Sequence, residues 1–395
     1  MLIKVIFPLH YWDNMPSEVN PVPKILCFSV SIGAGHDLAA QALIQEVKKR
    51  YPGATIELVD TFKYINPVLN KVLKGSYMET LKFTPRVWGY LYQQAEQEDR
   101  LVDMGAIMNK LLSPKLKKLV DDFQPDLLVC SHAFPCGMLS TLKKEHRLHT
   151  PILAVITDYT IHPFWIYEEV DGFIIPSEQL NYYLLAAGIR SEKIWPLGLP
   201  LRSQFADDLD QTQARTELGL QDTATVLVMG GGLGLGSMES IVSTLAESPL
   251  YLQVVAICGR NQKLQSKLED LKTRKSPPNP LIVLGFTGQM ARYMRAADVI
   301  ISKPGGLTTA EALACQVPLL IIDPIPGQET RNADFLLNHG VAMKAANPRE
   351  IIPTLQQFMN SPLRKKQIKE MAALLGKPRA AADIVDRIEK QYLNQ

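Results

Sequence analysis

The sequence has no apolar run approaching the roughly 20 residues that a membrane-spanning helix needs. Its first stretch, residues 1–23, begins apolar but is broken by Pro8 and His10, and no small-residue cleavage site follows. We therefore expect neither a spanning helix nor a signal peptide, and interpret residues 1–23 as a loose extension. Hydrophobic residues make up 46% and charged residues 21% of the 395, which is typical of a globular chain rather than a disordered one.

Cysteine and net charge are also low. The five cysteines are odd in number and form no CxxC pair, which predicts buried free thiols in a reducing compartment. The formal net charge is only +2, so any basic patch must be local. That charge excludes neither nucleic acid nor a membrane surface, but we expect no nucleic-acid partner.

Short apolar runs alternate with helical patterns along most of the chain. This alternation is typical of α/β proteins whose parallel, doubly wound sheets are covered on both faces. The expected strands are 24–30, 55–60, 127–131, 152–157, 172–176 and 193–196, then 224–230, 252–258, 281–285, 299–302 and 318–322. Helices such as 38–51, 114–122 and 237–246 are expected between them.

The strand series restarts after the polar stretch 198–219, which indicates two domains. We predict an N-terminal domain over 24–205, a C-terminal domain over 206–375, and a last helix within 376–395 that packs back on the first domain. In such sheets, ligands bind at the carboxyl ends of the strands.

The segment SVSIGAGH, residues 29–36, lies between a strand and a helix. Its glycines, Gly35 among them, permit a tight turn, and the helix start offers free N–H groups. His36 can take a proton from a hydroxyl nucleophile, because histidine titrates near neutral pH. A helix-capping histidine is the alternative interpretation.

A second loop, TDYTIHPFW at 157–165, follows the strand 152–157. Asp158 and His162 could orient a water, an acceptor hydroxyl or each other, and Trp165 would add aromatic surface. A packed loop without a functional role is the competing interpretation.

A third loop, MGGGLGLGS at 229–237, has five glycines that would let a phosphate approach the backbone. It lacks the Walker Lys-Ser/Thr, and no acid follows about 20 residues on, so neither a P-loop nor a nicotinamide site is indicated. We interpret it as a diphosphate contact, with a structural turn as the alternative.

The segment 302–332 contains two successive strand–loop–helix units. Thr308 and its neighbour can cap a helix and hold phosphate oxygens, and Glu311 is placed one turn further, where it could accept both ribose hydroxyls. Gln328, Glu329 and Asn332 carry the polar groups that a sugar's hydroxyls need. This segment predicts the donor site of a nucleotide-sugar glycosyltransferase.

These motifs, together with CGRN, GFTGQM and PIPGQETRNADFLLNHG, resemble the monogalactosyldiacylglycerol synthase and processive diacylglycerol glucosyltransferase family, a relative of the peptidoglycan N-acetylglucosaminyltransferase. The resemblance runs in order from about residue 24 to 340. It implies a GT-B fold, a UDP-hexose donor that is a substrate rather than a cofactor, and inverting transfer without a metal. It also implies diacylglycerol or glycosyl-diacylglycerol as acceptor, and we expect a peripheral position on the cytoplasmic face of the membrane.

By resemblance, His36 would be the general base, with Asp158 as rival or helper, and Gly35, His162 and Trp165 would lie at the acceptor. The donor would be held by residues that contact its diphosphate, uracil, ribose and hexose: Gly230, Gly231, Gly232, Gly259, Arg260, Asn261, Phe286, Lys303, Gly305, Gly306, Thr308, Glu311, Gln328, Glu329 and Asn332.

The segment 63–118 gives separate support for a membrane acceptor. It has ten basic and five acidic residues, and aromatics such as Trp88, which suit an anionic lipid surface. A solvated helical pair is the alternative. Two other activities stay open: transfer from UDP-N-acetylglucosamine to a polyprenyl-linked acceptor, and 2-epimerisation of a UDP-sugar.

Overall fold

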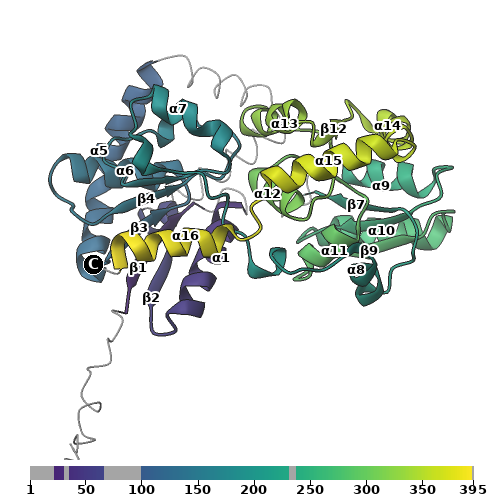
Figure 1. Ribbon diagram of the computed structural model, residues 1–395, viewed down its shortest axis with the longest axis horizontal. Coiled ribbons are helices and arrows are strands. Elements are labelled where there is room, and N and C mark those ends of the chain that lie inside the picture. Colours follow the sequence, from purple (N-terminus) through teal and green to yellow (C-terminus); the bar gives the residue numbers. More distant parts are fainter. Residues whose placement is uncertain (1–21, 31–34, 66–98, 231–236, 394–395) are drawn as a thin grey trace, which may run out of the picture.

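The computed structural model describes residues 22–30, 35–65, 99–230 and 237–393. Two six-stranded parallel sheets form two halves that lie side by side (Figure 1). Each sheet packs between two apolar layers, and one of these layers is a single cluster shared by both halves. This is the α/β architecture of the GT-B fold, with two doubly wound domains.

The first sheet has the order β2-β1-β3-β4-β5-β6, and its strand order reverses between β1 and β3. Central strands are apolar on both faces because helices cover both, and every residue of β3 and β4 is buried. The strands are β1 (Lys24–Ser29), β2 (Thr55–Asp60), β3 (Leu127–Cys130), β4 (Ile152–Val155), β5 (Gly172–Ile174) and β6 (Ile194–Trp195).

The second sheet has the order β12-β11-β10-β7-β8-β9 and reverses between β7 and β10. Its strands are β7 (Thr225–Met229), β8 (Gln253–Ile257), β9 (Leu281–Leu284), β10 (Val299–Ser302), β11 (Leu319–Ile321) and β12 (Ala342–Lys344). We had not predicted β12. It is a three-residue edge strand that is only partly buried, and one of its residues is a lysine, so it has no apolar run to reveal it.

The helices of the first half are α1 (Gly35–Arg50), α2 (Thr61–Ile65), α5 (Asp99–Phe123), α6 (Ala133–Lys144) and α7 (Asn181–Ala186). Those of the second are α8 (Gln211–Leu218), α9 (Met238–Ala246), α10 (Gln262–Lys275), α11 (Met290–Ala296), α12 (Gly306–Ala314), α13 (Gln328–Asn338), α14 (Ile351–Met359) and α15 (Pro362–Leu375).

Helix α5 corrects a sequence-based boundary. Pro114 reads as a helix start, because proline is favoured in the first turn, yet α5 runs through it from Asp99. A proline inside a helix leaves the carbonyl four residues earlier without its N–H partner. The Ser113 hydroxyl donates to that carbonyl, of Lys110, at 3.3 Å. The freed acceptor is therefore satisfied and the helix continues.

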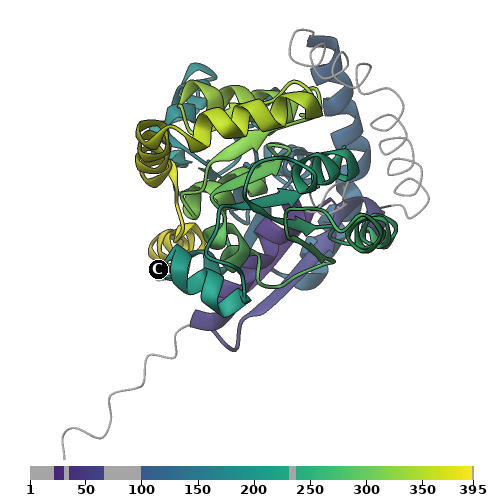
Figure 2. The ribbon, with the colours of Figure 1, turned by 90° about the vertical axis from the view of Figure 1, so that its right-hand side faces the viewer.

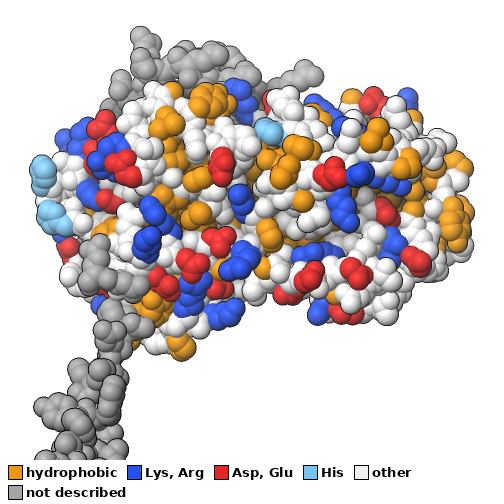
Figure 3. Space-filling view, viewed as in Figure 1, with side chains coloured by type: hydrophobic (Ala, Val, Ile, Leu, Met, Phe, Trp, Pro, Cys, Tyr) orange, Lys and Arg blue, Asp and Glu red, His pale blue; other side chains and the backbone are white. Residues whose placement is uncertain are grey.

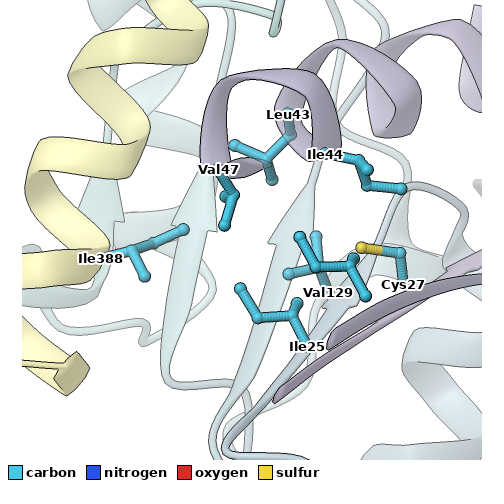
Figure 4. A pocket seen from close by; sticks show the side chains of 8 residues that line it. Ile25, Cys27, Leu43, Ile44, Val47, Val129 and Ile388 are labelled. Atoms are coloured by element: carbon cyan, nitrogen blue, oxygen red, sulfur yellow. The ribbon is translucent and has the colours of Figure 1, made fainter. Parts of the chain in front are cut away.

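The last helix, α16 (Ala380–Ile388), lies against α1 of the first half, while α15 covers the second (Figures 1 and 2). The Arg50 guanidinium of α1 bonds Asp386, the Ala382 carbonyl at 3.0 Å and Glu389 at 3.2 Å. Ile388 faces an apolar gap whose lining also includes Ile25, Leu43 and Val129 (Figure 4). The gap cannot hold a water molecule, so it is a packing seam. The domain limits themselves remain a prediction.

The face in Figure 3 shows no single field of one charge among the described residues. Basic and acidic side chains are interspersed over both halves on the face in Figure 3. Among the described residues, no helix is both long and apolar enough to cross a bilayer. All five cysteines are free and buried, as predicted.

Candidate functional site

His36 lies at the start of α1, where three chain segments of the first half meet. Its Nδ1 lies 2.7 Å from the carbonyl oxygen of Ser131 and 3.0 Å from Oγ1 of Thr157. Ser131 directly follows β3, and Thr157 lies two residues after β4. A carbonyl oxygen only accepts, so Nδ1 carries the ring hydrogen. Nε2 is therefore left with the free lone pair that a general base needs.

His132 packs its ring edge-on against His36, with 4.7 Å between the centroids. Its Nδ1 accepts from the Phe134 amide at 3.2 Å and so caps α6. Burial, and then the neighbouring His36, hold the pKa of His132 well below its usual value. His132 is therefore a neutral neighbour of the candidate base. Sequence reasoning missed it, although a histidine between a buried strand and a helix start is a visible signal.

The loop after β4 contacts the second domain. A Cβ atom added to Gly306, the first residue of α12, would lie 1.7 Å from the Thr157 carbonyl oxygen. Nearby, the side-chain amide of Asn332 on α13 donates to Oδ1 of Asp158 at 3.0 Å. The predicted acceptor loop and the predicted donor segment are therefore in direct contact.

Two carboxyl groups with raised pKa values lie in the donor segment: Glu311 is buried and Glu329 is half-buried. Burial raises the pKa of Glu311 on α12 to about 7, and the positive charge of Arg202 partly opposes the shift. Burial likewise raises the pKa of Glu329 to about 7. Its bond from the Ile325 amide and Lys303 lower that value, whereas the charge of Asp158 raises it. Both groups therefore change charge near neutral pH.

The phosphate end of the segment is formed by the turn before α12. Gly305 is the N-cap of α12, and Lys303 and Thr308 are partly exposed beside it. Thr309 is fully buried, and its hydroxyl has no hydrogen-bond partner among the described residues. The N-terminus of α12 thus provides unpaired N–H groups for an anion.

The Gly-rich loop after β7 is described only at its ends. Gly230 is buried at the end of the strand, whereas Gly231 and Gly232 lie outside the described residues. At the other end, Oδ2 of Asp323 accepts from the Ser237 amide at 3.2 Å and from its hydroxyl at 2.5 Å. Asp323 begins the loop that leads to Gln328 on α13. The predicted diphosphate and hexose loops are therefore linked through this carboxylate.

The predicted uracil residues form a pair at the edge of the second domain. The Arg260 guanidinium lies 6.0 Å from the centre of the Phe286 ring, which is 68% exposed. Gly259 has a φ of +58°, which glycine adopts without strain. The Asn261 oxygen accepts from the Leu264 amide at 3.0 Å and caps α10. An exposed ring beside a guanidinium can stack on a planar base.

The three predicted acceptor residues differ in their contacts and in their burial. His162 accepts from the Phe164 amide at 3.2 Å and caps the short turn Pro163–Trp165. Trp165 was expected to add aromatic surface, but it is only 6% exposed and belongs to the shared apolar cluster. Its large apolar area favours burial over exposure to water. Gly35 lies next to the second domain, where an added Cβ would be 3.8 Å from Cβ of Leu307.

The predicted basic segment is described only in part: residues 66–98, which include Trp88, lie outside the described residues. Lys115 on α5 instead donates to the Ile65 carbonyl at 2.7 Å. In the described ranges, no three His, Cys, Asp or Glu side chains gather in a way that would hold a metal ion.

Comparisons with known proteins match both halves of the chain. A family model for monogalactosyldiacylglycerol (MGDG) synthase matches residues 36–201, and one for the glycosyltransferase family 28 C-terminal domain matches residues 225–388. The processive diacylglycerol beta-glucosyltransferase of Staphylococcus saprophyticus is 30% identical over 352 residues, 88% of this chain and 87% of that protein.

Two solved structures share the fold. MurG of Acinetobacter baumannii superposes with a TM-score of 0.58 at 15% identity, covering 93% of this chain and all of that one. UGT71G1 of Medicago truncatula, complexed with UDP-glucose, gives 0.58 at 16%, covering 94% of this chain and all of that one. The chain belongs to the monogalactosyldiacylglycerol synthase and processive diacylglycerol glucosyltransferase family.

Proposed function

We propose that the chain transfers a hexose from a UDP-sugar to the hydroxyl of diacylglycerol. The observation that carries this proposal is the position of His36: its Nδ1 is committed to the Ser131 carbonyl, and it bonds Thr157, whose own carbonyl abuts the donor helix α12. A base held against the donor segment is what a hydroxyl nucleophile requires.

The proposed reaction is a single displacement with inversion. The lipid hydroxyl oxygen bonds to the anomeric carbon while the bond from that carbon to the β-phosphate oxygen breaks. The hydroxyl proton moves to Nε2 of His36, and UDP leaves with the bonding electron pair. Asp158, whose Oδ1 is bonded by Asn332, is the rival base.

The donor residues would share the remaining work. The N-terminus of α12 and Lys303 would offset the negative charge that develops on UDP, in place of a metal ion. Gly230, Gly231 and Gly232 would line the diphosphate. Glu311 would accept the ribose hydroxyls.

The rest of the donor would be held at its two ends. Arg260 and Phe286 would enclose the uracil. Gln328 and Glu329 would hold the hexose. UDP-sugar is then a substrate, and no separate cofactor is needed.

Fewer described contacts support the part of the proposal that concerns the lipid acceptor. We propose that the lipid reaches His36 past Gly35 and His162, with the chain docked peripherally on the anionic cytoplasmic face of a membrane. The basic residues of segment 63–118 support this part of the proposal, because each basic group near such a surface adds about 1 kcal/mol.

Vesicle assays test the proposed function. The purified chain is incubated with diacylglycerol vesicles and separately labelled UDP-glucose, UDP-galactose or UDP-N-acetylglucosamine, and the lipids are analysed by mass. We expect glycosyl-diacylglycerol from one of the two hexoses. Conversion of UDP-N-acetylglucosamine without lipid would instead indicate an epimerase. Transfer only to a polyprenyl-linked acceptor would indicate the other rival.

The affinity for UDP should depend on pH through Glu311. Its pKa of about 7 in the empty site means that the carboxyl is protonated below this pH and ionised above it. Only the ionised form accepts hydrogen bonds from both ribose hydroxyls, so affinity should fall as the pH drops below about 7. The dissociation constant should rise by up to about tenfold per pH unit there, measured by calorimetry.

A Glu311→Gln variant is the control for this pH dependence. The terminal phosphate of UDP itself titrates near pH 6, and that contribution remains in the variant. The wild-type chain should therefore show the steeper pH dependence. Equal slopes in the two proteins would contradict the role of Glu311.

A further inference from the structure

Asn332 is a fully buried polar side chain at the seam between the domains. Its Oδ1 accepts from the backbone amide of Tyr159 at 2.7 Å. Its Nδ2 donates to Oδ1 of Asp158 and to the carbonyl of Pro304, each at 3.0 Å. Tyr159 and Asp158 belong to the first domain, whereas Asn332 and Pro304 belong to the second. One amide therefore joins both domains.

The three partners require one particular side chain. The Tyr159 amide is a donor and needs an acceptor, while the Asp158 carboxylate and the Pro304 carbonyl are acceptors and need donors. Only a side-chain amide presents one acceptor and two donor hydrogens at this spacing. An aspartate would keep the first bond but would place two carboxylates together. An alanine would remove this partner from all three groups.

The residues that Asn332 holds are neighbours of the candidate base. Thr157, directly before Asp158, bonds Nδ1 of His36 and has its carbonyl against Gly306. The Tyr159 and Phe335 rings, with centroids 4.8 Å apart, add a second contact between this loop and α13. The loop that supports the base is thus held by the helix that carries Gln328 and Glu329.

We propose that Asn332 is a positioning residue that couples the donor domain to the base, by fixing the Asp158 carboxylate and the Tyr159 amide. This role, which rests on the proposed function, replaces the expected contact of Asn332 with a sugar hydroxyl. Asn332 acts through Asp158 and Tyr159 and does not itself touch the reacting atoms.

An Asn332→Asp variant tests the proposal through its pH profile. Two carboxyl groups at this distance raise the pKa of one of them, so the pair shares a proton at low pH, and the two carboxylates repel each other once both are ionised at high pH. The other titratable or charged groups around it are Glu329 on α13, Lys303 after β10 and His36 behind Thr157. These groups are the same in the variant and the wild type, so the pH profile of the wild-type chain is the reference for the variant.

We expect kcat of Asn332→Asp to fall by about 10²-fold at about pH 8, since small displacements of catalytic groups have effects of this size. At about pH 5.5 the shared proton again donates to Asp158, so kcat should return towards the wild-type value at that pH. Asn332→Ala should lose activity at both pH values. The Kd for UDP should change little in either variant.

The control is Asn338→Asp, the same change at an exposed position at the end of α13. It should keep the wild-type profile. A wild-type profile in Asn332→Asp, or an equal loss at every pH, would overturn the proposal. If the wild-type chain makes no glycolipid, the proposed function fails, and the contact of Asn332 with Asp158 and Tyr159 is then tested by melting temperature. The melting temperature of Asn332→Asp should drop further below that of the wild type as the pH rises. A difference that does not depend on pH would overturn the proposal.

Discussion

Replacing His36 with alanine should lower kcat for glycosyl-diacylglycerol formation by about 10²- to 10⁴-fold, the usual contribution of one general base. The affinity for UDP should stay near the wild-type value, because the donor contacts proposed above come from the second domain. Initial rates with diacylglycerol vesicles and calorimetry with UDP measure the two quantities separately.

Two further variants accompany His36→Ala, one as a control and one to test the rival base. His149→Ala changes an exposed histidine that precedes β4, whereas Thr157 and Asp158 follow that strand, and it should leave kcat unchanged. Asp158→Asn distinguishes the rival base, since it keeps a side chain of the same shape without the charge. If His36→Ala turns over normally while Asp158→Asn does not, the base is Asp158 and the role assigned to His36 is wrong.

The position of His36 could be predicted from the sequence, but the hydrogen bond that orients its ring could not. The motif placed a histidine at a strand-to-helix turn, which follows from local glycines and apolar periodicity. The partner of its Nδ1 is a backbone carbonyl almost a hundred residues away, at Ser131. Every residue type has such a carbonyl, so no side-chain pattern could reveal this bond. The same holds for the Gly306–Thr157 contact, which depends on how the domains meet.

The fold was easier to predict, for a physical reason. Buried parallel strands are continuous apolar runs, and each of the eleven expected runs contains a strand. The edge strand β12 lacks such a run, and α5 passes through Pro114 because Ser113 satisfies the freed carbonyl. The sequence-based prediction therefore failed at two places: a helix continued through a proline because one hydrogen bond compensated for it, and an exposed edge strand lacked an apolar run.

Burial is the other quantity that the sequence did not provide. The sequence indicates Glu311 and Glu329 as ligand-binding residues, but their pKa values are raised by burial, which is not visible in the neighbouring sequence. Likewise, Trp165 looked like part of an exposed aromatic loop and instead packs in the core. Charge state and exposure at the site had to come from the packed structure.

Replacing Gly306 with alanine should abolish most of the transfer activity, by about 10²-fold or more in kcat/KM. The new Cβ would lie 1.7 Å from the Thr157 carbonyl oxygen, a distance that no real Cβ contact shows, so backbone on one side must move. Either movement separates α12 from the loop that bonds His36. Alanine is otherwise the better helix former by about 0.5–1 kcal/mol, so the helix itself gives no reason for a loss.

The matched control is Gly53→Ala, in a turn of the first domain. Its added Cβ would meet only the Val22 side chain at 3.5 Å, an ordinary contact, and its backbone has no positive φ. This variant should keep wild-type kcat/KM. Full activity in Gly306→Ala would mean that transfer does not require the close approach of α12 to Thr157. The proposed coupling of the donor helix to His36 through the Thr157 carbonyl would then be wrong.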